Sequence, residues 1–460
     1  MSVQRGPRTA PPRTLRLPNR RQARRPVGGA DIRSGPSRDA ALDAARVLCL
    51  VCVVSIHILM VTLTTDPATG AVANVMAPTE AGWYPWASWA VQVMPLFFVV
   101  GGCASAISWA RHRARGGGGP SWVRGRLLRL ALPGALLWAV LALAAAAATA
   151  AGVPRQWVAA ALQGLGMHLW FLGAYVVCLV AVPWLHARHT RRPRTTIGLL
   201  ILAVAGIETL RILLADPWWG LLGLAVVWPA IQQIGFFRHD GSFARTPSWA
   251  LALIGLLSLG LLAATTAAPW WGEDALSTLN PPTICMVLLG IAQACALQLL
   301  SPVLERLMAL RPMVVLAWLV GSRALTLYLW HLPVIVAVMA AWWLLEAPDP
   351  APGSAGWWLW RIPLGVLCWV LVLLVVQPLG RLESRAAPAP VDDGGALHAS
   401  WPVVLIAAAA VVTPAVLEIR YLLSPPLTTA GAAAMILAVV LLSRRPAGAP
   451  GPRGETSTPT

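Results

Sequence analysis

Long apolar segments constrain this chain more than any other feature of its sequence. Twelve of them reach the ~20 residues that an α-helix needs to cross a bilayer. With 57% hydrophobic and only 12% charged residues, the chain cannot cover a soluble surface, for which roughly 25% charged residues is usual. We therefore predict an all-α, polytopic transmembrane helical bundle. The predicted spans begin near Arg46, Trp86, Leu127, Leu169, Ile197, Trp218, Ser248, Thr283, Ala324, Pro363, Trp401 and Leu427.

The basic residues of the chain predict its orientation in the membrane. All 35 are arginines, and they gather in every second connecting segment. Because arginine is enriched in cytoplasmic loops, we expect a multi-pass protein of the plasma membrane with both termini in the cytoplasm. This bias explains the net charge of +17 without a nucleic-acid partner. The absence of lysine excludes P-loop and Schiff-base lysine chemistry.

Arg46 and His57 are the first candidates for function, because ionisable residues within a membrane span are costly and usually functional. Their spacing of eleven residues is close to three helical turns, so both project from one face, separated by ~16 Å along the axis. His57 is thereby predicted near the middle of the membrane. The alternative is that Arg46 anchors the span at the interface and His57 hydrogen-bonds a neighbouring helix.

Arg126 and Arg129 form a second candidate site at the predicted cytoplasmic start of the third span. Residues three apart lie on one helix face, and two adjacent guanidinium groups suit a phosphate or pyrophosphate. The alternative is that these arginines only determine topology.

Three further groups of polar residues fall in or beside predicted spans. Tyr328 and His331 share a face of the ninth span, either as a structural pair or as part of a polar cavity. Glu208 and Arg211 are expected to form an ion pair, with a polar acceptor pocket as the alternative. His168 is expected to be hydrated at the outer interface.

Two other features are assigned no chemistry. The sequence shows no cluster of His, Asp and Cys with metal-ligand spacing, so no metal is expected. Tryptophans at the predicted outer span ends are interpreted as an aromatic belt. They are Trp83, Trp86, Trp89, Trp218, Trp219, Trp270, Trp271, Trp357, Trp358 and Trp360.

Five segments occur in an order that is typical of one family. Arg46 and His57 form an R-x10-H pattern, and Arg126 and Arg129 form an RxxR motif. The stretches 94–102, 168–172 and 328–331 read MPLFFVVGG, HLWFL and YLWH. Together they resemble the acyltransferase 3 family of bacterial integral-membrane acyltransferases over about residues 40–382. Gly101 stands where the family usually has a serine.

The resemblance implies an acyl-CoA-dependent O-acyltransferase. It implies transfer of an acyl group, most often acetyl from acetyl-CoA, to a hydroxyl of a surface or exported carbohydrate or a lipid-linked glycan. His57 would be the catalytic base or an acyl carrier, and His331 and Tyr328 would orient the acceptor or stabilise the oxyanion. The cytoplasmic acyl-CoA would be held by Arg46, Arg126 and Arg129.

Two other functions compete with this one. A proton-coupled secondary transporter would use His57, Glu208, Arg211 and His331 as a relay. A non-catalytic scaffold would use the same charges only to set helix register.

The resemblance also suggests a division of the chain. Residues 40–382 would form the acyltransferase 3-like membrane domain, with about ten spans. A disordered basic cytoplasmic tail (1–39) precedes it. A cytoplasmic linker (383–400), two additional spans (401–443) and a disordered cytoplasmic tail (444–460) follow.

Overall fold

The structure is a computed structural model. It describes residues 39–65, 70, 72–215, 217–268, 270–348, 350–386 and 400–443. The expectations for the two tails and for most of the linker concern residues outside these ranges. From Ala40 onward the chain forms one compact unit.

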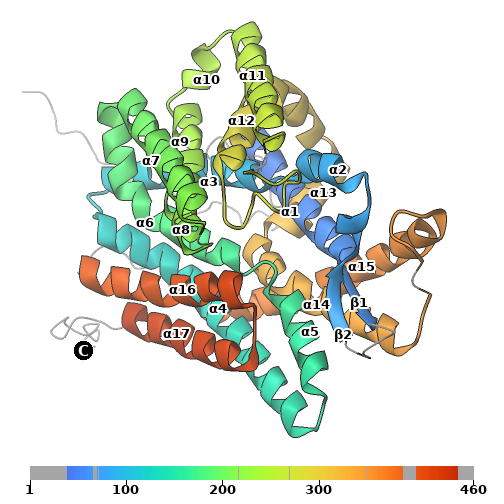
Figure 1. Cartoon of the computed structure of the whole chain (residues 1–460). Coiled ribbons are helices and arrows are strands. Elements are labelled where there is room, and N and C mark those ends of the chain that lie inside the picture. The colour runs from blue at the N-terminus through green and yellow to red at the C-terminus, as the bar shows by residue number, and fades with distance from the viewer. Residues whose placement is uncertain are drawn as a thin grey trace, which may run out of the picture. The chain divides into compact units, whose positions relative to one another are not determined.

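The described residues are mostly α-helical (Figure 1). Between Ala40 and Arg191 the elements are α1 (Ala40–Met60), β1 (Val61–Thr65), β2 (Val72–Met76), the 3-10 helix η1 (Ala77–Glu80), α2 (Tyr84–Val91), α3 (Met94–Ala114), α4 (Gly119–Ala150), α5 (Arg155–Gly166) and α6 (Trp170–Arg191). The chain continues with α7 (Pro193–Leu214), α8 (Pro217–Leu221), the 3-10 helix η2 (Leu222–Ala225), α9 (Val227–His239), α10 (Ser242–Arg245), α11 (Ser248–Thr266) and α12 (Ile284–Met308). The last elements are α13 (Arg311–Gly321), α14 (Ala324–Leu344), α15 (Ala355–Ala386), α16 (Trp401–Tyr421) and α17 (Pro425–Ser443).

Twelve helical segments in the described part of the chain are long and apolar enough to cross a membrane. The count and the all-α class agree with the sequence analysis, so both predictions are confirmed. The protein is a multi-pass membrane protein. The third and fourth segments begin at Gly119 and Arg155, eight and fourteen residues before their predicted starts at Leu127 and Leu169.

Three of the observed segments are interrupted rather than continuous. One break, at Gln92–Val93, separates α2 from α3, and another, at residues 167–169, separates α5 from α6. The third lies where η2 joins α8 to α9. Pro95 explains the first break, because a proline in a helix interior removes a backbone hydrogen bond and clashes with the carbonyl four residues earlier. Gly164 and Gly166 weaken the end of α5, since glycine is a poor helix former.

A short β-hairpin interrupts the helices after α1. Strands β1 and β2 are antiparallel, with Val61 opposite Met76 and Thr65 opposite Val72. The sequence analysis did not predict it. The run Val-Thr-Leu-Thr-Thr is rich in β-branched residues, which favour strands, so α1 passes directly into β1 at Val61.

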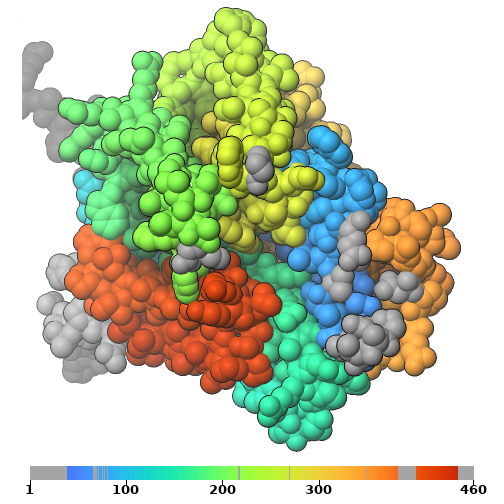
Figure 2. Space-filling model, viewed as in Figure 1, coloured from blue at the N-terminus to red at the C-terminus, as the bar shows by residue number. Residues whose placement is uncertain are grey.

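The last two spans are integrated into the bundle. Helices α16 and α17 lie side by side (Figure 1), and α17 packs along α4 while α16 packs on α6. In Figure 2 their red surface adjoins the teal surface of the α4–α5 segment. Arg124 Nε of α4 donates to Leu442 O, at 2.8 Å. Gly431 faces the fully buried indole of Trp138, and a Cβ at this position would lie 2.2 Å from the ring.

Candidate active site

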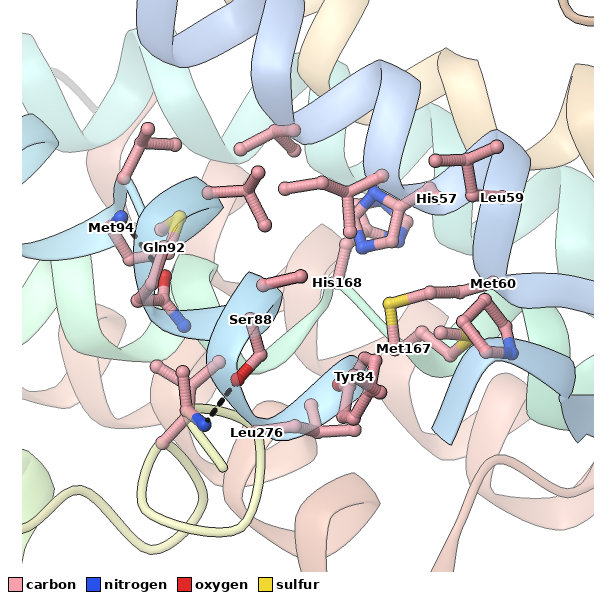
Figure 3. Close-up of a pocket in the computed structure, with 18 of the residues that line it drawn as sticks. His57, Leu59, Met60, Tyr84, Ser88, Gln92, Met94, Met167, His168 and Leu276 are labelled. Atoms are coloured by element: carbon pink, nitrogen blue, oxygen red, sulfur yellow. Dashed lines mark hydrogen bonds between the residues drawn. The ribbon is translucent and has the colours of Figure 1, made fainter. Parts of the chain in front are cut away.

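Two of the broken spans meet at one cavity of about 320 Å³. The breaks contribute Gln92 and Val93 from α2–α3, and Met167 and His168 from α5–α6. In Figure 3, His57 and His168 lie beside the thioether side chains of Met60 and Met167. Non-helical backbone at membrane depth is tolerated where it is buried in protein or lines a cavity. The breaks are therefore typical of a functional site rather than of a purely structural bundle.

Carbonyl groups at these breaks accept from side chains of other helices, and two of them also accept from the backbone, His168 O from Phe171 N and Val93 O from Phe97 N. Tyr328 donates its hydroxyl proton to the carbonyl of His168. Gln293 Nε2 donates to Gln92 O at 2.6 Å, and the Cys49 thiol lies 3.7 Å from Val93 O. Buried carbonyls without such partners would be costly. The polar residues of α12 and α14 thus stabilise the breaks that shape the cavity.

His57 and His331 form a hydrogen-bonded pair across two helices. His57 lies in the last turn of α1, nearer the helix end than its middle, and His331 lies in α14. Their Nδ1 and Nε2 atoms are 2.8 Å apart, and their ring centroids are 5.0 Å apart. The sequence analysis placed both residues among the catalytic candidates, and the fold brings the two rings into contact.

The hydrogen bonds of this pair determine which ring nitrogens carry protons. His331 Nδ1 is 2.7 Å from Tyr328 O and 3.1 Å from Leu327 O. Carbonyl oxygens only accept, so this nitrogen is assigned the proton and Nε2 of neutral His331 is an acceptor. His57 must then donate from Nδ1, which leaves the lone pair on its Nε2. Within the described residues, that nitrogen has no hydrogen-bond partner, and His57 lines the cavity.

His168 is the main error of the sequence analysis at this site. It was expected in water at the outer interface, but its side chain is only 2% exposed. Its ring lies 5.2 Å from that of His331 and 5.1 Å from that of Tyr328. Neither ring nitrogen makes a hydrogen bond of normal geometry among the described residues, although the carbonyls of Leu165 and Leu329 are near. The break before α6 turns it inward.

The lining of the cavity is neutral and mainly apolar. No Arg, Asp or Glu of the described residues contributes to it, and its polar groups include Ser88, Gln92 and Asn280. Ser88 Oγ accepts from the backbone of Ala275 at 2.9 Å, which ties α2 to the loop before α12. Trp83 and Trp358 also line the cavity, so the aromatic-belt interpretation is incomplete. Such a lining suits a substrate that is uncharged near the histidines.

The three candidate arginines do not line this cavity. Arg46 pairs with Asp43 of its own helix at 3.4 Å. Arg126 donates to Ser108 of α3 and stacks over Trp122 at 4.7 Å. Arg129 is exposed. The fold therefore separates a cationic region from a neutral histidine region, and the described cavity does not join them.

Glu208 and Arg211 form the expected ion pair, at 3.1 Å. Trp271 Nε1 donates to Glu208 Oε2 at 2.8 Å, and Arg211 donates to Trp270 O at 3.1 Å. The pair thus contacts the loop between α11 and α12 and does not line the histidine cavity.

Two further buried charges were missed. Arg361 is 5% exposed and Glu418 is 6% exposed. Glu418 lies so close to Gly166 that a Cβ there would be 2.7 Å from its Oε1, which brings α16 to the break before α6. The rule that intramembrane charges are functional candidates would have found both residues had it been applied to the runs around 357–363 and 401–421.

Fold and site together define a polytopic membrane protein with a neutral, histidine-containing cavity. A family model described as an acyltransferase domain, that of the acyltransferase 3 family, matches residues 39–377. The chain belongs to the acyltransferase 3 family, as its motifs indicate. The match ends within α15, so α16 and α17 lie outside it. No curated protein and no solved structure matches the chain significantly.

Proposed function

We propose that the protein is an acyl-CoA-dependent O-acyltransferase of the plasma membrane, with both termini in the cytoplasm. It transfers an acyl group, acetyl in the simplest case, from cytoplasmic acyl-CoA to a hydroxyl of a cell-surface or exported carbohydrate or of a lipid-linked glycan. The observation that supports this most directly is the His57–His331 pair, because it leaves a basic ring nitrogen at a neutral cavity.

His57 acts as the general base in this proposal. Its Nε2 removes the proton of the acceptor hydroxyl while the hydroxyl oxygen attacks the thioester carbonyl. The tetrahedral intermediate then collapses, the carbon–sulfur bond breaks, and the imidazolium returns the proton to the CoA sulfur. The hydrogen bond from Nδ1 to His331 becomes charge-assisted while His57 is protonated. Tyr328 positions His168 by donating a hydrogen bond to the His168 carbonyl.

The acceptor enters the cavity from outside in this proposal. The cavity lining includes Trp83, Tyr84 and residues of the loop 275–280. These residues lie in or next to connecting segments that carry few arginines. Positive charge marks the opposite, cytoplasmic side.

The donor is bound by the arginines of the cytoplasmic side. Arg126 and Arg129 bind the CoA phosphates, because guanidinium groups bind phosphates bidentately. Arg46 contributes to the same cytoplasmic donor site. The acyl-pantetheine arm then reaches toward His57 along α1.

A proton relay for transport has less support. It requires Glu208 and Arg211 to continue a path from the two histidines, whereas these residues bind Trp270 and Trp271.

The experiment that tests the proposal needs no knowledge of the acceptor. Thermal stability of the purified protein is recorded against acetyl-CoA concentration. We expect saturable stabilisation, about 2.7 kcal/mol at a ligand concentration of 100 Kd, for the unchanged chain and for Arg188→Ala/Arg191→Ala. That control removes another pair of arginines three residues apart, both of them exposed. Arg126→Ala/Arg129→Ala should weaken the stabilisation. No stabilisation by acetyl-CoA or longer acyl-CoAs would contradict the proposed donor.

The same preparations test the base. With membranes of the source cell as acceptor and radiolabelled acetyl-CoA as donor, His57→Ala should lower transfer by about 10²–10⁴-fold and keep the acetyl-CoA stabilisation. His239→Ala serves as the matched control. Transfer that persists in His57→Ala would remove His57 from the mechanism.

A further inference from the structure

Arg361 of α15 is an unusual arginine in this fold. Among the described arginines it alone is buried, with 5% exposure. Placing a guanidinium in a membrane protein interior is costly unless its donors are engaged. Its hydrogen bonds therefore indicate what it stabilises.

The contacts of Arg361 surround the junction between α1 and β1. Its Nη2 donates to Leu59 O at 3.3 Å and to Val61 O at 3.0 Å, and also to the hydroxyl of Thr62. Its guanidinium lies over the buried indole of Trp357, at 5.4 Å.

These contacts act on the part of α1 that carries His57. The last four carbonyls of a helix have no partner within it, and the helix end bears a partial negative charge. Here α1 ends at Met60 and β1 begins at Val61, without a loop between them. Arg361 donates to the carbonyl of Leu59, just before the junction, and to that of Val61, just after it. His57 lies two residues before Leu59.

Arg361 also contacts the helix that carries the partner histidine. Its Nη1 is 3.2 Å from Met339 Sδ of α14, eight residues after His331. One guanidinium thus joins α15 to both helices whose rings form the hydrogen-bonded pair.

We propose that Arg361 is a positioning residue for the acyl transfer. It holds the last turn of α1 so that His57 Nδ1 keeps its hydrogen bond to His331 Nε2 and Nε2 of His57 stays directed to the reacting hydroxyl. This inference rests on the proposed function, in which His57 is the base. Arg361 itself does not touch the substrates.

The test compares two arginines that both donate to helix-end carbonyls. Arg361→Lys keeps the charge but loses the planar guanidinium, whose Nη2 reaches the junction of α1 and β1 while its Nη1 reaches Met339 of α14. Arg124→Lys is the matched control, because Arg124 donates to Leu442 O in the last turn of α17. We expect Arg361→Lys to lower kcat for acetyl transfer about tenfold or more, since small misplacements of catalytic groups can cost up to ~10²-fold, with the KM for acetyl-CoA unchanged. Arg124→Lys should keep kcat per folded molecule.

A second measurement separates this inference from the proposed function. In protein labelled with ¹⁵N-histidine, the imidazole N–H signal that disappears both in His57→Ala and in His331→Ala reports the His57–His331 hydrogen bond. Arg361→Lys should shift or broaden this signal, and Arg124→Lys should leave it unchanged. An unchanged signal, or an unchanged kcat, in Arg361→Lys would overturn the positioning role. If the unsubstituted protein transfers no acetyl group, the proposed function is contradicted. The N–H signal then still shows whether Arg361 maintains the His57–His331 hydrogen bond.

Discussion

Tyr328, one of the proposed catalytic residues, contacts the backbone of another helix. Its hydroxyl donates to the carbonyl of His168 at the break between α5 and α6, and that carbonyl also accepts from Phe171 N at 3.2 Å. A donor engaged in this way is not free to bind an oxyanion. Its removal deletes one of two hydrogen bonds to this carbonyl, and a typical hydrogen bond contributes about 0.5–1.5 kcal/mol.

We therefore predict that Tyr328→Phe mainly lowers stability. The melting temperature should fall, because the ring is kept while its hydrogen bond is lost. The kcat for acetyl transfer per folded molecule should fall less than the ~10²–10³-fold that removal of an oxyanion donor causes. Thermal unfolding and radiolabel transfer check the two effects. An unchanged melting temperature together with a kcat loss of that size would assign the hydroxyl to the oxyanion instead.

Helices α16 and α17 show how elements outside the family match become part of the bundle. They pack on α4 and α6, and Glu418 of α16 reaches the break beside His168. Close approach depends on small residues, as is usual where membrane helices pack without a hydrophobic driving force. Gly431 is one such residue, because Trp138 occupies the space where a side chain would lie.

A pair of glycine substitutions tests this packing. Gly431→Ala should destabilise the protein by about 1–3 kcal/mol, since an added methyl group overpacks against Trp138. Gly260→Ala on α11, where nothing lies within 4 Å of the new Cβ, should be neutral or stabilise by about 0.4–1 kcal/mol. Thermal unfolding in the same detergent measures both. Equal shifts for the two variants would contradict close contact between α17 and α4.

The whole molecule is asymmetric across the membrane. Arginine-rich connections such as 238–245 alternate with connections that carry few arginines, such as the one containing Glu273. The histidine cavity lies among elements that adjoin the second kind, and Arg126 and Arg129 belong to the first kind. In the proposed function, the donor and the acceptor therefore approach from opposite sides.

Labelling at the two ends of α11 tests this orientation. In intact cells, a membrane-impermeant maleimide should label Glu273→Cys, while Ala244→Cys should react only after permeabilisation. Both positions are exposed, and the unchanged chain measures background from its seven cysteines, all of which lie in apolar segments. The reverse pattern would place the cavity on the cytoplasmic side and overturn the proposed route of the acceptor.

Local sequence information was sufficient for the spans and for part of the site. A run of about 20 apolar residues favours a helix in a membrane, because backbone groups that face lipid need partners within the segment. The twelve spans therefore follow from hydropathy alone, whereas the breaks within three of them do not. The spacing of Arg46 and His57 along one helix is equally local. The family, too, was recognisable from short motifs.

Contacts between distant segments required the tertiary structure. His57 and His331 are 274 residues apart in sequence, so no local pattern could show that their rings share a hydrogen bond. The burial of His168 accompanies a helix break whose carbonyl accepts a hydrogen bond from Tyr328 of another helix. Arg361 likewise reaches across some 300 residues to Leu59 and Val61. Hydropathy determines which segments are helical, whereas the choice of partner for each buried polar group depends on how the helices pack.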